Sequence, residues 1–383
     1  MYNILTLNKI SPKGLAKLDS AKYACGDSVA SPDAVLVRSA SMHETALDEA
    51  TVAIARAGAG VNNIPVADCA EKGVVVFNTP GANANAVKEL VICALLLSSR
   101  KIADSVDWCK TLKGEGENVG KLVEKGKSAF AGPEILGKTL GVVGMGAIGA
   151  LVAGSAQALG MSIVGYDPFL SEQSAADFIA KGMEITSDIN DIYAKSDYIT
   201  LHLPLNDSTR GTVSAETIAK MKDGVRILNF ARGELVDNAS LIAALDSGKV
   251  AAYVTDFPTD EQIGHAGVTA IPHLGASTPE SEENCAVMAA EQVAAYLEKG
   301  EIKNSVNFPA ASLAPSFKVR TCLLHKEDEA MLDKALAAAA NAGAAVESSF
   351  SASKKGMGYT VLDTDKEFDA AVDGVIKARI LKA

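Results

Sequence analysis

One histidine follows an apolar stretch that is expected to end at the edge of a sheet. His273 comes directly after the apolar residues 268–272 and precedes Leu-Gly-Ala-Ser-Thr. An imidazole titrates near neutral pH, so His273 could exchange a proton with a substrate hydroxyl. Asp256, Asp260 and Glu261 follow the preceding apolar stretch, so a carboxylate could orient this imidazole and favour its protonated form. We therefore expect His273 to be the proton-transfer residue.

Arg232 lies in a similar position after another apolar stretch. It follows residues 225–231 and precedes Gly233. A guanidinium group there could bind a substrate carboxylate and polarise the neighbouring carbonyl. Taken alone, Arg232 would be a solvated loop charge and His273 a partly exposed polar side chain. Together, at the ends of strands of one parallel sheet, where ligands bind, they indicate a catalytic site.

A glycine-rich segment precedes both residues. Residues 139–143 form an apolar run, and Gly144, Gly146 and Gly149 then open an alanine-rich helix. This Gly-x-Gly-x-x-Gly pattern, with a second strand expected at 162–166, is typical of a dinucleotide-binding turn. Gly144 permits the tight turn, Gly146 lets a pyrophosphate approach the backbone, and Gly149 allows close packing of helix on strand.

The acidic residue that such a turn requires is also present. Asp167 ends the second strand, near the spacing of about 20 residues that is typical of this motif. Its carboxylate would accept hydrogen bonds from the ribose hydroxyls and repel a 2′-phosphate. No Arg or Lys follows Asp167 closely, so NAD is expected rather than NADP. The N-terminus of the helix that begins near Ala147 and Ile148 would receive the pyrophosphate.

Two arginines in the first quarter of the chain could bind an anionic substrate. Arg38 and Arg56 each end an apolar run of the first domain, so they could point into a cleft between the domains, and residues 58–60 add glycine N–H groups. Such a cluster suits the phosphate of a small molecule. Alternatively, both arginines are ordinary surface residues.

The remaining pattern predicts the elements that hold these residues. Nearly continuous apolar runs alternate with Ala- and Leu-rich helical segments, which is typical of parallel sheets covered on both faces. The sequence therefore predicts an α/β protein with two doubly wound parallel sheets, a Rossmann-like NAD domain and a flavodoxin-like substrate domain. The expected strands are 3–8, 34–39, 74–78, 139–143, 162–166, 198–203, 225–231, 250–256 and 268–272; the clearest helices are 86–98, 148–159 and 283–298.

A division into domains follows from these elements. Residues 1–97 and 282–308 are expected to form the substrate domain, and residues 98–281 the NAD domain. Residues 317–383 have the order strand, helix, strand, strand, helix, strand, with the second helix at 366–375. This order predicts a small ferredoxin-like domain.

Composition excludes several classes of protein. The 383 residues carry a formal net charge of −11, so the chain has no general attraction for nucleic acid or an anionic membrane. The longest apolar run, 90–97, is too short to span a bilayer, and the N-terminus lacks the pattern of a signal peptide. The six cysteines form no Cys-x-x-Cys pair, so we expect neither a disulfide scaffold nor a metal site, and a cytoplasmic location.

Several of these stretches together resemble the D-isomer-specific 2-hydroxyacid dehydrogenases, over nearly the whole chain. The resemblance is strongest to the branch that acts on 3-phosphoglycerate, and it implies NAD-dependent oxidation of that phosphorylated 2-hydroxyacid, the first step of serine biosynthesis. The matching stretches are Val37-Arg-Ser, Arg56-Ala-Gly-Ala-Gly-Val, Asn78-Thr-Pro-Gly-Ala-Asn, the glycine pattern, His202-Leu-Pro, Asn229-Phe-Ala-Arg-Gly-Glu-Leu-Val-Asp, Asp256 with Glu261, and Pro272-His-Leu-Gly-Ala-Ser-Thr.

The resemblance also implies roles for individual residues. The catalytic residues would be Arg232, Glu261 and His273. Family members usually have Asp-Val-Phe before the acidic segment, whereas this chain has Asp-Phe-Pro, and a one-residue gap would select Asp260 instead of Glu261. The implied cofactor contacts are Gly144, Gly146, Ala147, Ile148, Gly149, Asp167, His202, Pro204, Ala231, Asp256 and Gly275, with Asp256 at the nicotinamide carboxamide. The implied substrate contacts are Arg38, Ser39, Arg56, Ala59, Gly60 and Asn83.

Two further expectations concern regulation and assembly. Residues 317–383 resemble the ACT regulatory domain, in which paired domains bind serine. Here Glu327, Glu329 and Ala330 replace the Asn, Pro and Gly of the serine-binding loop, so we expect an ACT-like fold that is insensitive to serine. The helix at 86–97 is apolar on nearly all sides and is expected to be buried, and in the family this region lies at a dimer contact, which predicts a homodimer or homotetramer.

Two other functions stay open at this point. The chain could be another dehydrogenase of the family, acting on glyoxylate, hydroxypyruvate, lactate or a larger 2-ketoacid. It could also be a non-catalytic NAD sensor that binds a partner, as do transcriptional corepressors that resemble this family. Arg38, Arg56 and the C-terminal module favour the phosphorylated substrate.

Overall fold

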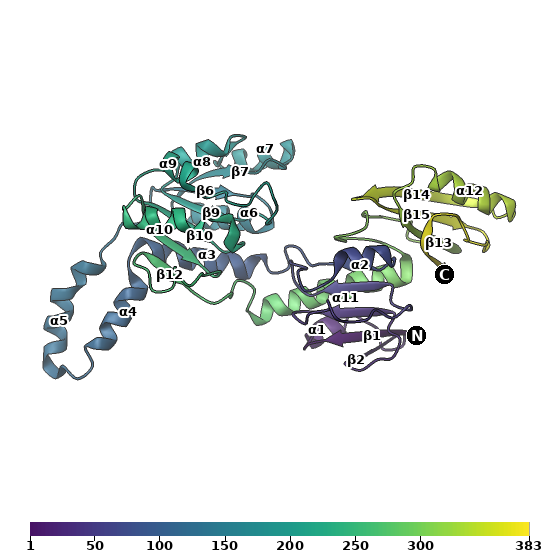
Figure 1. Ribbon diagram of the computed structural model, residues 1–383, viewed down its shortest axis with the longest axis horizontal. Helices are drawn as coiled ribbons and strands as arrows, with labels where there is room; N and C mark the ends of the chain where they lie inside the picture. Colours follow the sequence, from purple (N-terminus) through teal and green to yellow (C-terminus); the bar gives the residue numbers. More distant parts are fainter. Residues whose placement is uncertain (383) are drawn as a thin grey trace. The chain divides into compact units, whose positions relative to one another are not determined.

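The computed structural model describes residues 1–382 (Figure 1). The chain folds into two compact units. Unit 1 comprises Met1–Asn83 and Thr278–Ala383, and unit 2 comprises Ala84–Ser277. Within residues 1–382, no helix is both long and apolar enough to cross a bilayer.

The first sheet of unit 1 is parallel, with the strand order β2-β1-β3-β4-β5. This 2-1-3-4-5 order is that of flavodoxin-like sheets. The strands β2 and β4 were not among those expected from the sequence. The strands are β1 Tyr2–Leu7, β2 Tyr23–Gly26, β3 Ala34–Val37, β4 Ala53–Arg56 and β5 Val75–Phe77.

Helices cover both faces of this sheet. The long helix α11, Pro279–Lys299, packs its Val293 and Tyr296 with Phe77 in one apolar cluster. On the opposite face, Cys69 of α2, Val66–Glu71, packs in a second cluster. Neighbouring residues of a strand therefore face different clusters, which explains why the strands are apolar throughout. A short helix, α1, spans Pro12–Leu15.

Unit 2 contains a seven-stranded parallel sheet with the order β12-β11-β10-β9-β6-β7-β8. Numbered within the unit, this is the Rossmann order 3-2-1-4-5-6 with one strand added beyond the sixth. The strands are β6 Thr139–Val143, β7 Ser162–Tyr166, β8 Glu184–Thr186, β9 Tyr198–Leu201, β10 Val225–Asn229, β11 Val250–Thr255 and β12 Val268–Ala270. The helices are α3 Ala84–Ser99, α6 Ala147–Ala158, α7 Glu172–Ala180, α8 Ile189–Lys195, α9 Ala215–Lys220 and α10 Asn238–Asp246, with a 3-10 turn at Gly233–Leu235.

The two faces of this sheet form separate apolar clusters. Val142 packs with Val91 of α3 and Val152 of α6 on one face. Val143, the next residue of the same strand, packs on the other face with Ile192 of α8. Helices therefore cover both faces of the sheet, as in a doubly wound fold.

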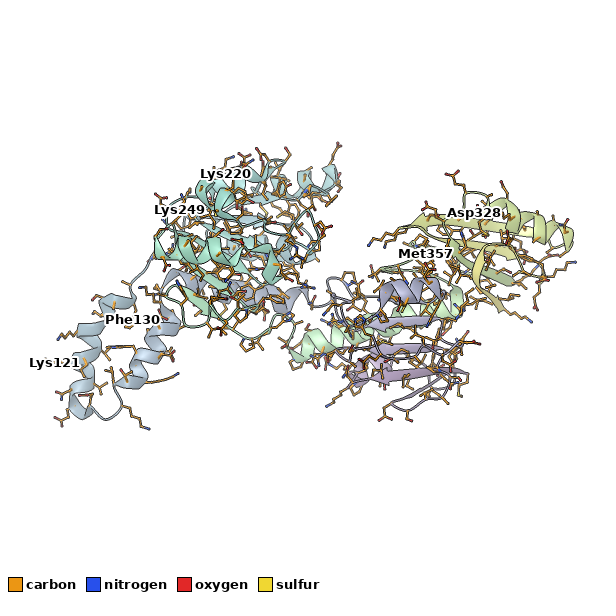
Figure 2. All side chains as sticks on the ribbon, in the orientation of Figure 1. Lys121, Phe130, Lys220, Lys249, Asp328 and Met357 are labelled. Carbon is orange, nitrogen blue, oxygen red and sulfur yellow. The ribbon has the colours of Figure 1, made fainter. Side chains whose placement is uncertain are left out.

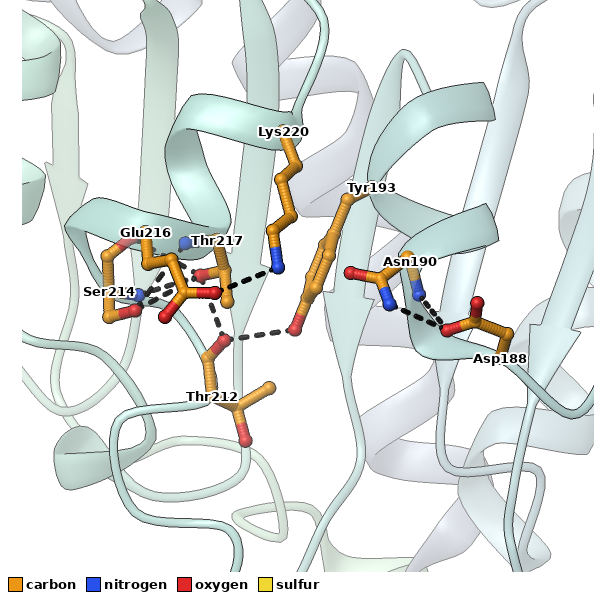
Figure 3. A network of polar contacts seen from close by, with 8 residues as sticks. All are labelled: Asp188, Asn190, Tyr193, Thr212, Ser214, Glu216, Thr217 and Lys220. Carbon is orange, nitrogen blue, oxygen red and sulfur yellow. Dashed lines mark hydrogen bonds and ion pairs between the residues drawn. The ribbon is translucent and has the colours of Figure 1, made fainter.

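Polar contacts fix the loop between β9 and α9 on the second face (Figure 3). The Tyr193 hydroxyl donates to the Thr212 carbonyl oxygen over 3.0 Å. Ser214 and Thr217 form a capping box at the start of α9. Burial raises the pKa of Tyr193 to about 12, so its phenol stays a hydrogen-bond donor. This network holds α8 and α9 together below the carboxyl edge of the sheet.

The segment 100–133, which follows α3, has no buried residue. It contains two helices, α4 Ile102–Thr111 and α5 Val119–Gly126, with 3-10 turns at Gly116–Asn118 and Lys127–Phe130. No residue of α4 or α5 is buried. The rings of Trp108 and Phe130 pack 5.4 Å apart, and a Cβ at Gly126 would lie 2.4 Å from the Trp108 ring. Both helices extend away from the sheet of unit 2, and Figure 2 labels Lys121 and Phe130 on this pair.

The C-terminal sheet of unit 1 is antiparallel, with the order β14-β15-β13-β16. The helix predicted at 366–375 is not formed, so that prediction is wrong. Phe368 of this segment instead packs into the cluster beneath α12, and Gly374 takes a positive φ of 92° before the last strand begins. The elements are β13 Val319–Lys326, α12 Met331–Asn341, β14 Val346–Lys354, β15 Met357–Thr364 and β16 Val375–Lys382.

The C-terminal sheet is joined to the rest of unit 1 at the end of α11. Arg320, which is fully buried, binds both carboxylate oxygens of Asp363 and donates to the Lys299 carbonyl oxygen over 2.7 Å. Arg379 donates to the carbonyl oxygens of Tyr296 and Leu297. Two cationic side chains therefore satisfy the last carbonyls of α11, where the helix dipole is negative. This module thus shares one core with the first sheet.

Candidate active site

The glycine-rich turn has the backbone that its sequence requires. Gly144 has φ 97°, and a Cβ there would lie 2.6 Å from the carbonyl oxygen of His202. A Cβ at Gly149 would lie 1.9 Å from the Gly144 oxygen, so only glycine lets α6 pack this closely on β6. A Cβ at Gly146 would meet nothing within 4 Å. The backbone at Gly146 therefore faces open space at the start of α6.

This open position fits a pyrophosphate. Ala147 and Ile148 begin α6, whose N-terminus has no side-chain cap, so backbone N–H groups are available to an anion. Asp167 ends β7 beside this turn. Its Oδ2 accepts from the Met145 N–H over 3.0 Å, and its Oδ1 accepts from the Phe169 N–H over 2.9 Å. The carboxylate thus fixes the glycine-rich turn.

His202 is the most perturbed histidine of the site. It follows β9, and its Nε2 lies 3.0 Å from the Thr200 hydroxyl. Burial lowers the pKa of His202 to about 4, so this ring is neutral at physiological pH. Nearby Pro204 accepts a hydrogen bond from the Thr209 hydroxyl. His202 is therefore a positioning group at the cofactor turn and not a proton donor near pH 7.

The residues predicted for proton transfer and for carboxylate binding both lie near one aromatic ring. The centroids of the His273 and Phe257 rings are 4.4 Å apart, with the rings tilted by 47°. The guanidinium carbon of Arg232 lies 5.9 Å from the centre of the Phe257 ring. Phe257 therefore lies close to both the exposed His273 and the half-buried Arg232.

Asp256 provides the buried negative charge of this group. It is 2% exposed, its Oδ2 accepts from the Gly275 N–H over 3.2 Å, and its Oδ1 has no hydrogen-bond partner among residues 1–382. Burial raises the pKa of Asp256, while the charges of His273 and Arg232 act in the opposite direction. The buried Asp256 carboxyl is therefore under the influence of the charges of both His273 and Arg232.

A buried asparagine sets the loop that carries Arg232. The Asn229 amide donates to the Arg232 carbonyl oxygen over 2.8 Å, and its Oδ1 accepts from the Ala231 N–H over 3.2 Å. The Arg232 guanidinium donates to the Ala231 carbonyl oxygen over 2.6 Å. Asn229 thus holds both ends of the turn after β10.

Glu261 lies elsewhere. It is exposed, and its Oε2 accepts from the Asn238 amide over 3.2 Å. Its own backbone N–H and the side chains of Thr259 and Asn238 lower the pKa of the Glu261 carboxyl. No contact within residues 1–382 joins Glu261 to His273. Asp260, the alternative to Glu261, is also exposed, whereas Asp256 is buried. Which carboxylate supports His273 stays a prediction.

The predicted anion-binding residues gather at one edge of unit 1. Val37 and Arg56 are partners in the register of β3 and β4, so Arg38 and Arg56 follow adjacent strand ends. The Arg56 Nε donates to the Arg38 carbonyl oxygen over 3.1 Å. A Cβ at Gly58 would lie 2.3 Å from Nη1 of Arg56, so glycine is required beneath this guanidinium.

The other predicted substrate residues lie in the loops of this edge. The Ser39 N–H donates to the Asn8 side chain over 3.0 Å, and Ala59 accepts from the Asn78 amide over 2.6 Å. Gly60 follows Ala59 in the same loop. The Asn83 Oδ1 is buried and has no hydrogen-bond partner among residues 1–382.

Sequence reasoning missed three polar residues of this edge. Asn8 takes a positive φ of 68° and binds the N–H groups of Ser39 and Ala40. Glu282 at the start of α11 binds Arg38 over 2.5 Å. The Thr79 hydroxyl is buried without a partner among residues 1–382. Only Asn8 had a signal, because asparagine after a strand often adopts a left-handed conformation.

Comparison with known proteins decides the family. The family model for the D-isomer specific 2-hydroxyacid dehydrogenase, NAD binding domain, matches residues 92–276. A hydroxypyruvate reductase from Thermotoga maritima is 39% identical over 274 residues, which are 68% of this chain and 83% of that protein. The chain belongs to the D-isomer-specific 2-hydroxyacid dehydrogenase family. Unit 2, with its glycine-rich turn and Asp167, contains the match to the NAD-binding domain of this family.

Other members of the family are similar over more of the chain. A D-3-phosphoglycerate dehydrogenase from Bacillus subtilis is 33% identical over 340 residues, which cover 84% of this chain and 62% of that protein. The chain spans between 47% and 62% of the first three curated relatives. The crystal structure of NAD⁺-bound 3-phosphoglycerate dehydrogenase in Entamoeba histolytica is 27% identical, with a TM-score of 0.62, and covers 80% of this chain and 98% of that one.

Proposed function

We propose that this dehydrogenase uses NAD to oxidise 3-phospho-D-glycerate to 3-phosphohydroxypyruvate, the first step of serine biosynthesis. The observation that carries the substrate assignment is the pair of guanidinium groups, Arg38 and Arg56, at adjacent strand ends of unit 1. A phosphate monoester carries a charge of about −1.5 to −2 at neutral pH, and guanidinium groups bind it by paired hydrogen bonds. The similarity to named 3-phosphoglycerate dehydrogenases supports the same assignment.

The cofactor contacts follow from the residues that fit it. The N-terminus of α6 at Gly146 and Ala147 would hold the pyrophosphate, and Asp167 would hold the adenosine ribose. The unpartnered Oδ1 of Asp256 suits an amide donor such as the nicotinamide carboxamide. NAD, when bound, accepts the hydride that leaves C2 of the substrate. The remaining cofactor contacts would come from His202, Pro204, Ala231 and Gly275.

His273 is assigned as the residue that accepts the proton of the substrate hydroxyl. Its ring is exposed and makes no hydrogen bond within residues 1–382, so a ring nitrogen is free to accept the C2 hydroxyl proton. Arg232 would bind the substrate carboxylate and stabilise the developing carbonyl oxygen. The rest of the substrate would be oriented by Ser39, Ala59, Gly60 and Asn83.

Asp256 is proposed as the carboxylate that supports the protonated form of His273. The resemblance assigns this role to Glu261, but Glu261 is exposed and bound to Asn238. Asp256 is buried and interacts electrostatically with both His273 and Arg232. It is therefore a positioning residue for proton transfer, and Glu261 would act only if its loop moved.

One assay tests the function. The purified chain is incubated with NAD and 3-phosphoglycerate, and NADH formation is followed by absorbance. D-glycerate and D-lactate serve as unphosphorylated controls, and hydroxypyruvate and glyoxylate are tested with NADH in the reverse direction. We expect the highest kcat/KM with 3-phosphoglycerate. Equal or higher values for the unphosphorylated compounds would contradict the proposal.

A second candidate is a hydroxypyruvate or glyoxylate reductase. The contact that favours it is Glu282 on Arg38, which lowers the positive charge of the proposed phosphate site. The same assay separates the two activities. A chain that binds NAD but turns over none of these substrates would instead be a non-catalytic NAD sensor.

The remaining proposals concern regulation, assembly and location. We assign an ACT-type fold to the C-terminal sheet, supported by its strand order, with a structural role and no response to serine. Self-association as a homodimer or homotetramer is supported by apolar side chains that α3 and α6 leave exposed. Six free cysteines suit a reducing compartment such as the cytoplasm.

A further inference from the structure

Two successive glutamates at the start of α11 contact different cations. Glu282 Oε1 accepts from Arg38 Nη2 over 2.5 Å. Glu283 Oε2 accepts from Lys13 Nζ over 2.6 Å. Glu282 therefore contacts the proposed phosphate-binding arginine, whereas Glu283, with the same charge one residue later, does not.

The contact with Arg38 lies inside the proposed substrate site. Arg56 binds the carbonyl oxygen of Arg38, so both guanidinium groups belong to the same strand edge. Burial raises the pKa of the Cys285 thiol on the next turn of α11, and the charges of Arg56 and Arg38 act in the opposite direction. The first turns of α11 and the two arginines are thus one electrostatic cluster.

A substrate phosphate and the Glu282 carboxylate need the same donor. The two arginines contribute two positive charges, and Glu282 cancels one of them. A phosphate oxygen that binds Nη2 of Arg38 must therefore replace the Glu282 oxygen or share the donor with it, and a carboxylate that stays nearby repels the phosphate.

We propose that Glu282 is a specificity-determining residue that competes with the substrate phosphate for Arg38 and leaves this guanidinium when the phosphate binds. The inference rests on the proposed function only in its assignment of Arg38 to the phosphate. Glu282 thereby lowers the affinity of the site for anions in general. Only a ligand with enough negative charge to displace a carboxylate binds well.

The expected effect is modest. The Arg38 and Glu282 side chains are 37% and 41% exposed. Exposed ion pairs are weak, so removing the Glu282 charge should raise the affinity for phosphate by about two- to fivefold. The rival role, in which Glu282 holds Arg38 in place for the substrate, predicts the opposite sign.

The experiment compares Glu282→Gln with the matched control Glu283→Gln in the full chain with NAD bound. We expect the KM for 3-phosphoglycerate to fall about two- to fivefold in Glu282→Gln and to stay unchanged in Glu283→Gln. Glu282→Ala provides a second variant without the charge, and thermal unfolding confirms that each variant is folded. An unchanged or higher KM in both Glu282 variants would overturn the proposal, as would an equal fall in Glu283→Gln.

A binding measurement keeps this proposal separate from the proposed function. Inorganic phosphate is titrated calorimetrically into each variant at low ionic strength. We expect tighter binding in Glu282→Gln than in the wild type, and loss of that gain in the double variant with Arg38→Ala. If 3-phosphoglycerate is not turned over but this binding pattern is seen, the proposed function is contradicted, whereas the proposal that Glu282 competes with phosphate for Arg38 is supported. If the affinity for phosphate is the same in all variants, the proposal that Glu282 competes with phosphate for Arg38 is contradicted.

Discussion

The ring of His273 packs against the ring of Phe257, with 4.4 Å between their centroids. Phe257 directly follows the buried Asp256, and the charge of His273 acts on the Asp256 carboxyl. The loop after β11 therefore packs against the side of the imidazole that follows β12.

His273→Ala should lower kcat by about 10²–10⁴-fold, which is the usual contribution of a general acid or base. NADH binding, followed by fluorescence, should change little, because His273 makes no hydrogen bond that supports the cofactor turn. His265→Ala is the control, since its ring contacts Ala266 and Asp246 in the same domain. Near-normal turnover in His273→Ala would refute the assignment.

Asp256→Asn should impair turnover while leaving the fold equally or more stable at pH 7. Burial raises the pKa of Asp256 in the folded protein above the pKa in the unfolded chain. As the pH rises from the unfolded pKa to the folded pKa, ionisation of Asp256 therefore lowers the free energy of unfolding. The gain in thermal stability should therefore disappear in acid, below about pH 4. Activity is measured as a pH profile of kcat beside Glu261→Gln, which should stay close to wild type. A greater loss in Glu261→Gln would restore the role that the resemblance assigns to it.

Asp167→Asn should weaken NAD binding and narrow the difference in KM between NAD and NADP. The substitution keeps an oxygen that can accept from Met145 but removes the charge that repels a 2′-phosphate. Asp167→Ala should also loosen the glycine-rich turn, since two backbone hydrogen bonds of about 1 kcal/mol each are lost. Steady-state kinetics with both cofactors decide the matter. Equal KM values for NAD and NADP in the wild type would show that Asp167 does not select between the two cofactors.

L-serine should not inhibit the enzyme. Asp328 of the loop after β13 binds the Ala330 N–H over 2.9 Å and Lys334 over 2.8 Å, so its carboxylate is already engaged, and Glu327 and Glu329 add negative charge. A serine carboxylate would be repelled there. Titration of L-serine into the activity assay is the measurement, with D-serine as the control. Inhibition by submillimolar L-serine alone would show that this interpretation of the loop is wrong.

The chain should be at least a dimer, and α3 should contribute to the contact. In the single chain one face of α3 is open, because Leu96 is 45% exposed while Val91 on the other face is fully buried. Leu151 of the neighbouring α6 is also exposed. Leu96→Glu should shift the mass measured by light scattering toward the monomer, whereas Ile179→Glu on α7 should not. A monomeric wild type at micromolar concentration would contradict the prediction.

The sequence by itself determined the elements whose pattern is local. The strand, glycine turn and helix at 139–158 could be predicted closely, because glycine spacing and apolar runs report backbone conformation directly. The helix α11 was predicted at 283–298 and spans Pro279–Lys299, so its start was placed four residues late although Pro279 is a usual first residue of a helix; its end before Gly300 agrees within one residue. The segment 366–375 failed because its apolar residues suit a helix, while packing of Phe368 and the turn at Gly374 decided otherwise.

Only the tertiary structure decided which charged groups meet. Asp256 and Glu261 both follow β11, and spacing alone cannot tell which carboxylate faces His273. The structure adds that Asp256 is buried and that Phe257 packs against the ring of His273, and both observations depend on the packing of β11 against β12. The pairing of Arg38 with Glu282, residues far apart in the chain, was equally beyond the sequence. It depends on α11 lying against β3 and β4, which brings a helix start to the strand ends that carry the arginines.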